Sequence, residues 1–85
     1  MKIQGYGLTE HPLAQHGHGI EVIKAHLGGD QYLASIAPDF GTVESEDESE
    51  QEFAPGDYIV TDDPPTHAWA VEHNSFEATF TIPEQ

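Results

Sequence analysis

Residues 54–61 read APGDYIVT, a turn followed directly by the most regular strand pattern in the chain. The proline, glycine and aspartate at 55–57 are typical turn residues, each for its own backbone reason. Residues 58–61 combine aromatic and β-branched side chains, which favour a β-strand. Residues 62–65, DDPP, must leave that strand, because paired prolines cannot sit inside a hydrogen-bonded ladder. The stretch therefore predicts one strand with a defined start and end.

Other apolar runs extend the pattern in both directions. Residues 20–27, IEVIKAHL, and 31–38, QYLASIAP, flank Gly28-Gly29-Asp30, which predicts a β-hairpin because these residues accept positive φ. A helix over 20–27 that ends at Gly28 is the alternative. Turn residues at 38–41 follow.

After the prolines, residues 67–71 and 80–82 read as short strands, with a single helical turn after Asn74 and Ser75. About five short strands and tight turns predict a mainly β fold, or an α+β fold with at most one short helix. We expect a small, strongly bent antiparallel sheet or an SH3-like, partly open barrel. The predicted core consists of Val22, Leu33, Ile36, Phe53, Tyr58, Val60, Trp69, Val71, Phe76, Phe80 and Ile82.

The chain has 85 residues, 36% of them hydrophobic, which predicts one small domain over 1–85. Within it we expect a flexible Gly- and His-rich segment at 1–19, an acidic loop at 44–52 and a β module at 54–82. So small a core would gain stability from a partner or from a homodimer. The absence of cysteine and of an apolar leader or membrane-length run predicts a cytoplasmic protein without disulfides or membrane contact.

Residues 54–80 also resemble the PGDYG-type module of small bacteriophage and prophage proteins. The likeness rests on an ordered set of anchors: Pro55, Gly56, Asp57, Tyr58, Trp69, Val71, Phe76 and Phe80. DDPPTH replaces the Gly-Glu turn usual in these modules, and Ala70 stands where proline is usual. The resemblance covers about the last third of the chain and implies a compact β module of phage or mobile-element origin. It implies no activity and no catalytic residues.

Catalytic and metal-binding patterns are weak. His16 and His18 form a His-x-His pair that would point to one face of a strand, but glycines surround them, so a solvated loop is favoured over a zinc site. No serine lies in a recognised nucleophile motif, and the clustered carboxylates have no burial to tune their pKa. We therefore expect no enzyme activity and no cofactor.

Charge is the strongest functional signal. Sixteen Asp and Glu face only Lys2 and Lys24, which gives a formal net charge of −14. Such a chain would repel nucleic acid and anionic membranes, and it favours a basic partner. Six carboxylates fall in the nine positions 44–52, and two more follow the strand at 58–61. The predicted partner-binding residues are Glu44, Glu46, Asp47, Glu48, Glu50, Glu52, Asp62 and Asp63.

These observations favour a phage-encoded inhibitor that mimics DNA. In size, charge and lack of cysteine the chain is similar in type to small acidic phage inhibitors of host nucleases, glycosylases and CRISPR effectors. The alternative is a small accessory β module that docks a partner through Trp69, Tyr58 and nearby aromatic residues, with the acidic loop serving solubility. Adaptation to high salt is a third interpretation, but it would spread the carboxylates over the surface.

Overall fold

The structure, a computed structural model, describes residues 1–15 and 21–82. It is mainly β with one short α-helix, which confirms the predicted fold class. None of the helices in these ranges is long and apolar enough to span a membrane. The elements are β1 Lys2–Gln4, the 3-10 helix η1 Pro12–Gln15, β2 Ile23–Leu27, β3 Asp30–Ile36, β4 Gly41–Glu44, β5 Glu50–Phe53, β6 Tyr58–Asp62, β7 Ala68–Val71 and α1 His73–Thr79.

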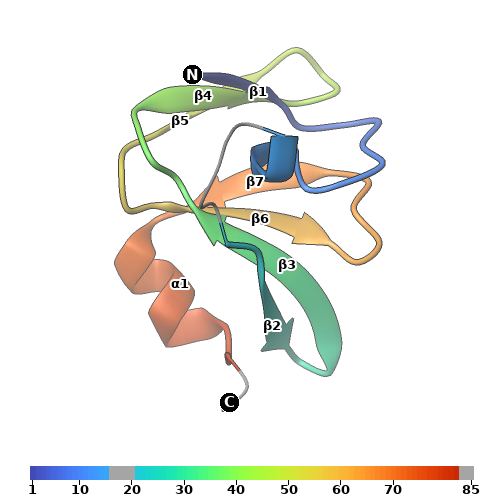
Figure 1. Cartoon of the computed structure of the whole chain (residues 1–85), viewed down its shortest axis with the longest axis vertical. Helices are drawn as coiled ribbons and strands as arrows, with labels where there is room; N and C mark the ends of the chain where they lie inside the picture. The colour runs from blue at the N-terminus through green and yellow to red at the C-terminus, as the bar shows by residue number, and fades with distance from the viewer. Residues whose placement is uncertain (16–20, 83–85) are drawn as a thin grey trace.

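The strands form two sheets rather than one bent sheet, and they do not close into a barrel. The first sheet has the order β1-β4-β5 and the second the order β2-β3-β6-β7, as Figure 1 shows above and below the centre. All pairs are antiparallel except β1 with β4. The hairpin β2–β3 turns at Gly28 and Gly29, both at positive φ, so the strand prediction for 20–27 is confirmed over β2 and the helix alternative is wrong.

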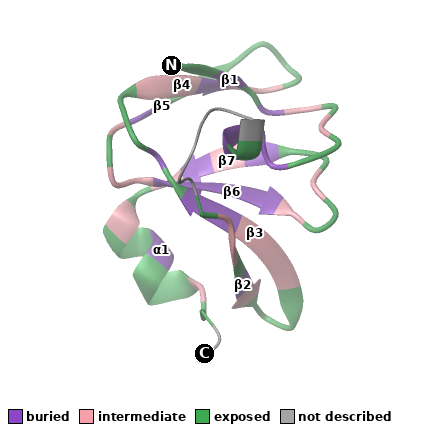
Figure 2. Cartoon of the chain, viewed as in Figure 1, coloured by how far each residue is buried: buried purple, intermediate pink, exposed green. Residues whose placement is uncertain are grey.

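Strand β6 is buried on both faces from Tyr58 to Thr61, as is typical of a strand that begins with three consecutive apolar residues. Ile59 faces the first sheet and η1, in a cluster with Ile3, Leu13, Val43 and Phe53. Tyr58 and Val60 face the other way, in a second cluster with Ala25, Ala34 and Phe76 of α1. Figure 2 shows the buried strand at the centre, between the first sheet and the helix.

Helix α1 is held by stacked rings. Phe76 is fully buried and lies between Tyr58, at 3.9 Å between ring centroids, and Phe80, at 4.7 Å. Tyr32 then meets both Phe80 and Trp69 edge-on. The predicted single turn after Asn74 and Ser75 is thus a seven-residue helix, because its one buried face completes an aromatic cluster.

Several predictions about the ends of elements are wrong. Residues 1–15 are not a flexible segment: β1 lies in a sheet, and Ile3 and Leu13 are buried. Ile36 and Ile82 were predicted in the core but are 49% and 40% exposed, since each lies where its strand pairing stops. The predicted strand at 80–82 is reduced to one bridge between Thr81 and His26.

Gly5 joins the two sheets. Its amide donates to the carbonyl of Glu44 at 2.7 Å, and its carbonyl accepts from the amide of Ala68 at 3.0 Å. A Cβ at this position would lie within 3 Å of the carbonyl oxygens of both Glu44 and Ala68. Only glycine therefore allows the chain leaving β1 to pass between β4 and β7.

Candidate functional site

The acidic segment 44–52 is a β-hairpin and not a loop, which corrects the prediction. Glu44 ends β4, residues 45–49 turn, and Glu50 begins β5. Glutamate is a poor strand former, so local preference pointed to a loop. The hairpin forms because Val43 and Phe53 alternate with the acidic residues and are buried against the second sheet.

The turn at 45–49, which we call the acidic turn, has a fixed backbone. The Ser45 amide donates to the Ser49 carbonyl at 2.8 Å, and Glu48 adopts a positive φ of 70°. The Asp47 carboxylate accepts from the Ser49 hydroxyl at 2.6 Å and the Ser49 amide at 3.2 Å. These bonds hold the pKa of Asp47 below its ordinary value. The turn thus presents three exposed carboxylates, those of Glu46, Asp47 and Glu48.

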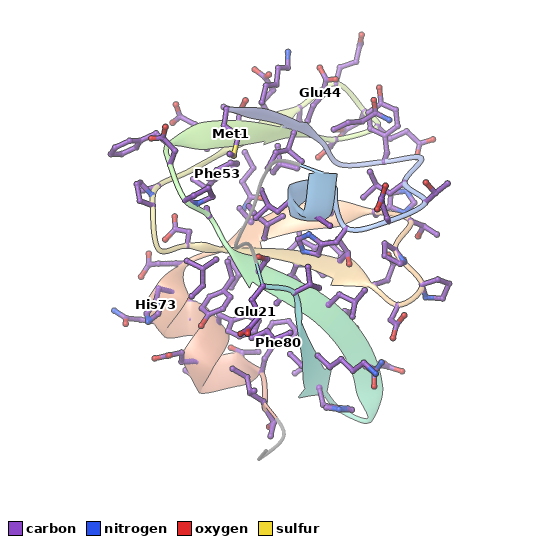
Figure 3. All side chains as sticks on the ribbon, in the orientation of Figure 1. Met1, Glu21, Glu44, Phe53, His73 and Phe80 are labelled. Carbon is purple, nitrogen blue, oxygen red and sulfur yellow. The ribbon has the colours of Figure 1, made fainter. Side chains whose placement is uncertain are left out.

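Three further carboxylates share the outer side of the hairpin. Because Val43 and Phe53 point inward, Glu44, Glu50 and Glu52 point to solvent, and we call them the outer acidic face. Figure 3 shows Glu44 at the outer rim of the sheet and Phe53 beneath it. Glu44 lies directly opposite Glu50, about 5 Å away between Cβ atoms. Glu52 follows Glu50 at about 7 Å along the strand.

Lys2 reduces the repulsion between the first two of these groups. Its ammonium lies 3.9 Å from Glu44 and 3.4 Å from Glu50, on the neighbouring strand β1. All three side chains are exposed or half exposed, so the pairs are weak and screened by salt. Glu52 has no ion pair within the described residues.

The acidic turn and the loop after β6 lie on the same side of the molecule (Figure 1). They meet where the Glu46 carboxylate lies 3.4 Å from the imidazole Nε2 of His67. Asp62, however, serves the loop itself: its two oxygens accept from the Thr66 amide and hydroxyl and from the His67 amide. Burial alone would raise the pKa of Asp62, but these bonds lower it below its ordinary value.

Asp63 is exposed and accepts a hydrogen bond from the side chain of Gln31 on β3. The structure therefore brings the six carboxylates of residues 44–52 onto one hairpin and places the Asp62 loop beside its turn. Of the two aspartates predicted to bind a partner, Asp62 mainly stabilises the loop after β6 through these hydrogen bonds. Its position in the sequence did not indicate this role.

His16 and His18 lie outside the described residues. Within 1–15 and 21–82, no three His, Asp or Glu side chains are placed to share a metal ion. His11, considered from the sequence as a possible third ligand beside His16 and His18, is buried: its Nε2 lies 2.9 Å from the Ile59 carbonyl and its Nδ1 accepts from the Leu13 amide at 3.2 Å. Burial lowers the pKa of His11, and the bond to Ile59 opposes that only in part.

The aromatic residues proposed as docking anchors lie mostly inside. Tyr58 is 4% exposed and stacked between His73 and Phe76. Burial, together with the charge of Glu77, raises the pKa of its hydroxyl. Trp69 is partly exposed but packs against the helix cluster and Tyr32. The exposed aromatic side chain of this fold is instead Phe40, which is 68% exposed.

No family model, curated protein or solved structure matches the chain. The resemblance of residues 54–80 to the PGDYG-type module therefore rests on those residues alone.

Proposed function

We propose that the chain is a non-enzymatic acidic binding protein that inhibits a nucleic-acid-binding protein by occupying its basic groove as a DNA mimic. The target class is a host defence protein, such as a CRISPR effector, a nuclease or a glycosylase. The implied source is a phage or mobile element, and the implied site of action is the host cytoplasm.

The observation that carries the proposal is the ordered hairpin. Its six carboxylates lie on paired strands and a hydrogen-bonded turn, and the backbone positions of Glu44, Glu50 and Glu52 are held about 5 to 7 Å apart. A groove that binds nucleic acid recognises mainly regularly spaced negative charge. Since the backbone that carries the carboxylates is already ordered, a partner would not have to supply the free energy of ordering a loop.

The first test is capture of proteins from a bacterial lysate on the immobilised chain at about 0.1 M salt, followed by competition with duplex DNA. We expect a retained DNA-binding protein that the chain displaces from DNA, with affinity that falls steeply between about 0.1 and 0.5 M salt. A retained protein that ignores both salt and DNA would contradict the proposal.

Two variants with equal charge separate the hairpin from net charge. The test variant carries Glu46→Gln, Asp47→Asn, Glu48→Gln and Glu50→Gln, in which the amide oxygen introduced at position 47 can still accept from Ser49. The control carries Glu10→Gln, Glu21→Gln, Asp30→Asn and Glu72→Gln, which are exposed positions elsewhere on the chain. The test variant should lose inhibition and the control should keep most of it. Equal losses of inhibition in the two variants would show that the hairpin contributes only through the overall negative charge of the protein.

A further inference from the structure

Beside the outer acidic face, an open recess of about 540 Å³ lies between the start of β4, the end of β5 and the turn at Asp57. Its lining includes two aromatic residues, Phe40 and Phe53, and two acidic residues, Glu52 and Asp57. Gly41 allows this arrangement, because a Cβ there would lie 2.7 Å from the Phe53 ring. The recess therefore combines aromatic surface with negative charge.

Phe40 is exposed on a backbone that is held from both sides. Its amide donates to the Asp39 carboxylate at 2.7 Å, and its carbonyl accepts from the ammonium group of Met1 at 3.1 Å. The ring is thus a large apolar surface left in water on an anchored stretch of backbone. Scattered exposed apolar residues are ordinary, but one that lines a recess with two carboxylates is suited to a ligand.

The two carboxylates are available for a cation. Asp57 uses its Oδ2 to accept from the Ala54 amide at 2.9 Å, and the described residues offer no partner to its Oδ1. Glu52 is exposed and points outward from β5. In the part of the chain that the structure describes, neither carboxylate has a cationic partner.

We propose that this recess binds an arginine side chain of the basic partner, so that the partner's guanidinium lies against Phe40 between Glu52 and Asp57. The inference rests on the proposed function for its occupant and extends the outer acidic face by one specific contact. Guanidinium fits better than ammonium, because it is planar, stacks on aromatic rings and donates to carboxylates in a fixed fork. The alternative occupants are lysine and a neutral apolar side chain.

The test uses the full chain labelled with ¹⁵N, in about 0.15 M salt, and four short peptides that differ at one residue: arginine, lysine, citrulline or leucine. We expect saturable amide shifts centred on Phe40, Gly41 and Phe53 with the arginine peptide. Lysine should bind about two- to fivefold more weakly, and citrulline and leucine should leave these amides unchanged. Equal shifts with lysine or leucine, or shifts spread over the acidic turn, would overturn the inference.

Exposed positions supply variants that should fold. Phe40→Leu keeps an apolar side chain but removes the aromatic face, and Glu52→Gln removes one charge. Each should weaken arginine binding about two- to fivefold, whereas Glu48→Gln, with the same charge change in the acidic turn, should change it less than about 1.5-fold. If Glu48→Gln and Glu52→Gln weaken arginine binding equally, the peptide is attracted by the overall negative charge and the recess is not an arginine site.

The same variants separate this inference from the proposed function. If the chain displaces a protein from DNA, and Phe40→Leu and Glu52→Gln weaken displacement no more than Glu48→Gln, the arginine site is overturned while the mimicry stands. If arginine binds the recess as expected but no DNA-binding protein is displaced, the mimicry is wrong and the recess remains a guanidinium site.

Discussion

Replacing His11 by glutamine should change how the stability of the protein depends on pH. His11 is buried with both ring nitrogens in use, next to the carbonyl of Ile59 and the amide of Leu13. This pattern assigns the neutral tautomer in which Nε2–H donates and Nδ1 accepts. A proton added at Nδ1 would face the Leu13 amide and break that bond.

The sign of the effect follows from the lowered pKa. Burial, the larger cause, lowers the pKa of His11 below its ordinary value of 6.5 in the folded state. The unfolded chain therefore binds this proton at higher pH than the folded chain does. The stability due to the neutral ring is fully present above about pH 6.5 and is lost as the pH falls towards the folded pKa. Within that window the slope approaches about 1.4 kcal/mol per pH unit, the value for one proton.

Urea unfolding of the wild type and of His11→Gln between about pH 7.5 and 5.0 measures this slope. Glutamine can donate to the Ile59 carbonyl but leaves the Leu13 amide unpaired, which should cost about 1–3 kcal/mol at the upper end of that range. That difference should shrink below about pH 6.5, since only the wild type takes up the extra proton on unfolding. The carboxylates and the other histidines titrate in both proteins and cancel in the difference.

A difference in unfolding free energy that stays constant over the whole pH range would refute the reasoning. If the variant does not fold, the ring resonances of His11 in the wild type provide the same test. They should stay in the neutral form as the pH falls below about 6.5, the ordinary pKa of histidine.

Three further substitutions test the packing around the hairpin, each by urea unfolding. Gly5→Ala should lower the free energy of unfolding by about 2–4 kcal/mol, because the added Cβ would clash with two backbone carbonyls. A decrease under about 1 kcal/mol would mean that the two sheets can separate at this point without cost. Thr61→Val should stabilise the fold by about 1 kcal/mol, because the buried Thr61 hydroxyl has no hydrogen-bond partner in the described residues. The exposed control Thr81→Val should be near neutral, and a destabilised Thr61 variant would imply that a bound water pairs with this hydroxyl. Gln51→Ala should lower the free energy of unfolding by about 1–3 kcal/mol, because the Gln51 side-chain amide accepts from the N–H of Ala70 and donates to its carbonyl. An unchanged stability would show that β5 and β7 are held together by apolar contacts alone.

The parts of the fold that the sequence predicted are those with local signals. Gly28 and Gly29 do adopt positive φ between β2 and β3. The turn before β6 has Gly56 at a φ of 95° and Asp57 bonding the Ala54 amide. In each case the residue type restricts the backbone directly, so neighbouring residues were enough to predict it.

The missed features depend on contacts between distant segments. The parallel pairing of β1 with β4 joins the start of the chain to its middle, Lys2 to Thr42, and leaves no local pattern in the sequence. Ile59 was left out of the predicted core, although a continuous apolar run such as residues 58–60 is typical of a strand covered on both faces. The pattern that could have identified β5 is the alternation in EQEF, which the charge density obscured.

The candidate site was predicted as a set of residues but not as a shape. All six carboxylates of 44–52 do lie on one hairpin, yet their alternation with Val43, Gln51 and Phe53 is what orders them. The recess at Phe40 could not be predicted, because it requires β4, β5 and the turn at Asp57 to meet. No short segment contains that information.

The position of the charges bears on whether they protect a sheet edge from pairing with another chain. Glutamates on an edge strand often serve to prevent pairing with another chain. Here β5 already lies beside β7. The side chain of Gln51 donates to the carbonyl of Ala70 and accepts from its amide, as the backbone of a neighbouring strand would. Glu44, Glu50 and Glu52 stand on the outer face of the sheet, and Lys2 on β1 reduces the repulsion between Glu44 and Glu50. Because side-chain bonds to Ala70 already occupy this edge, we propose that these carboxylates serve contact with a basic groove rather than protection of the edge.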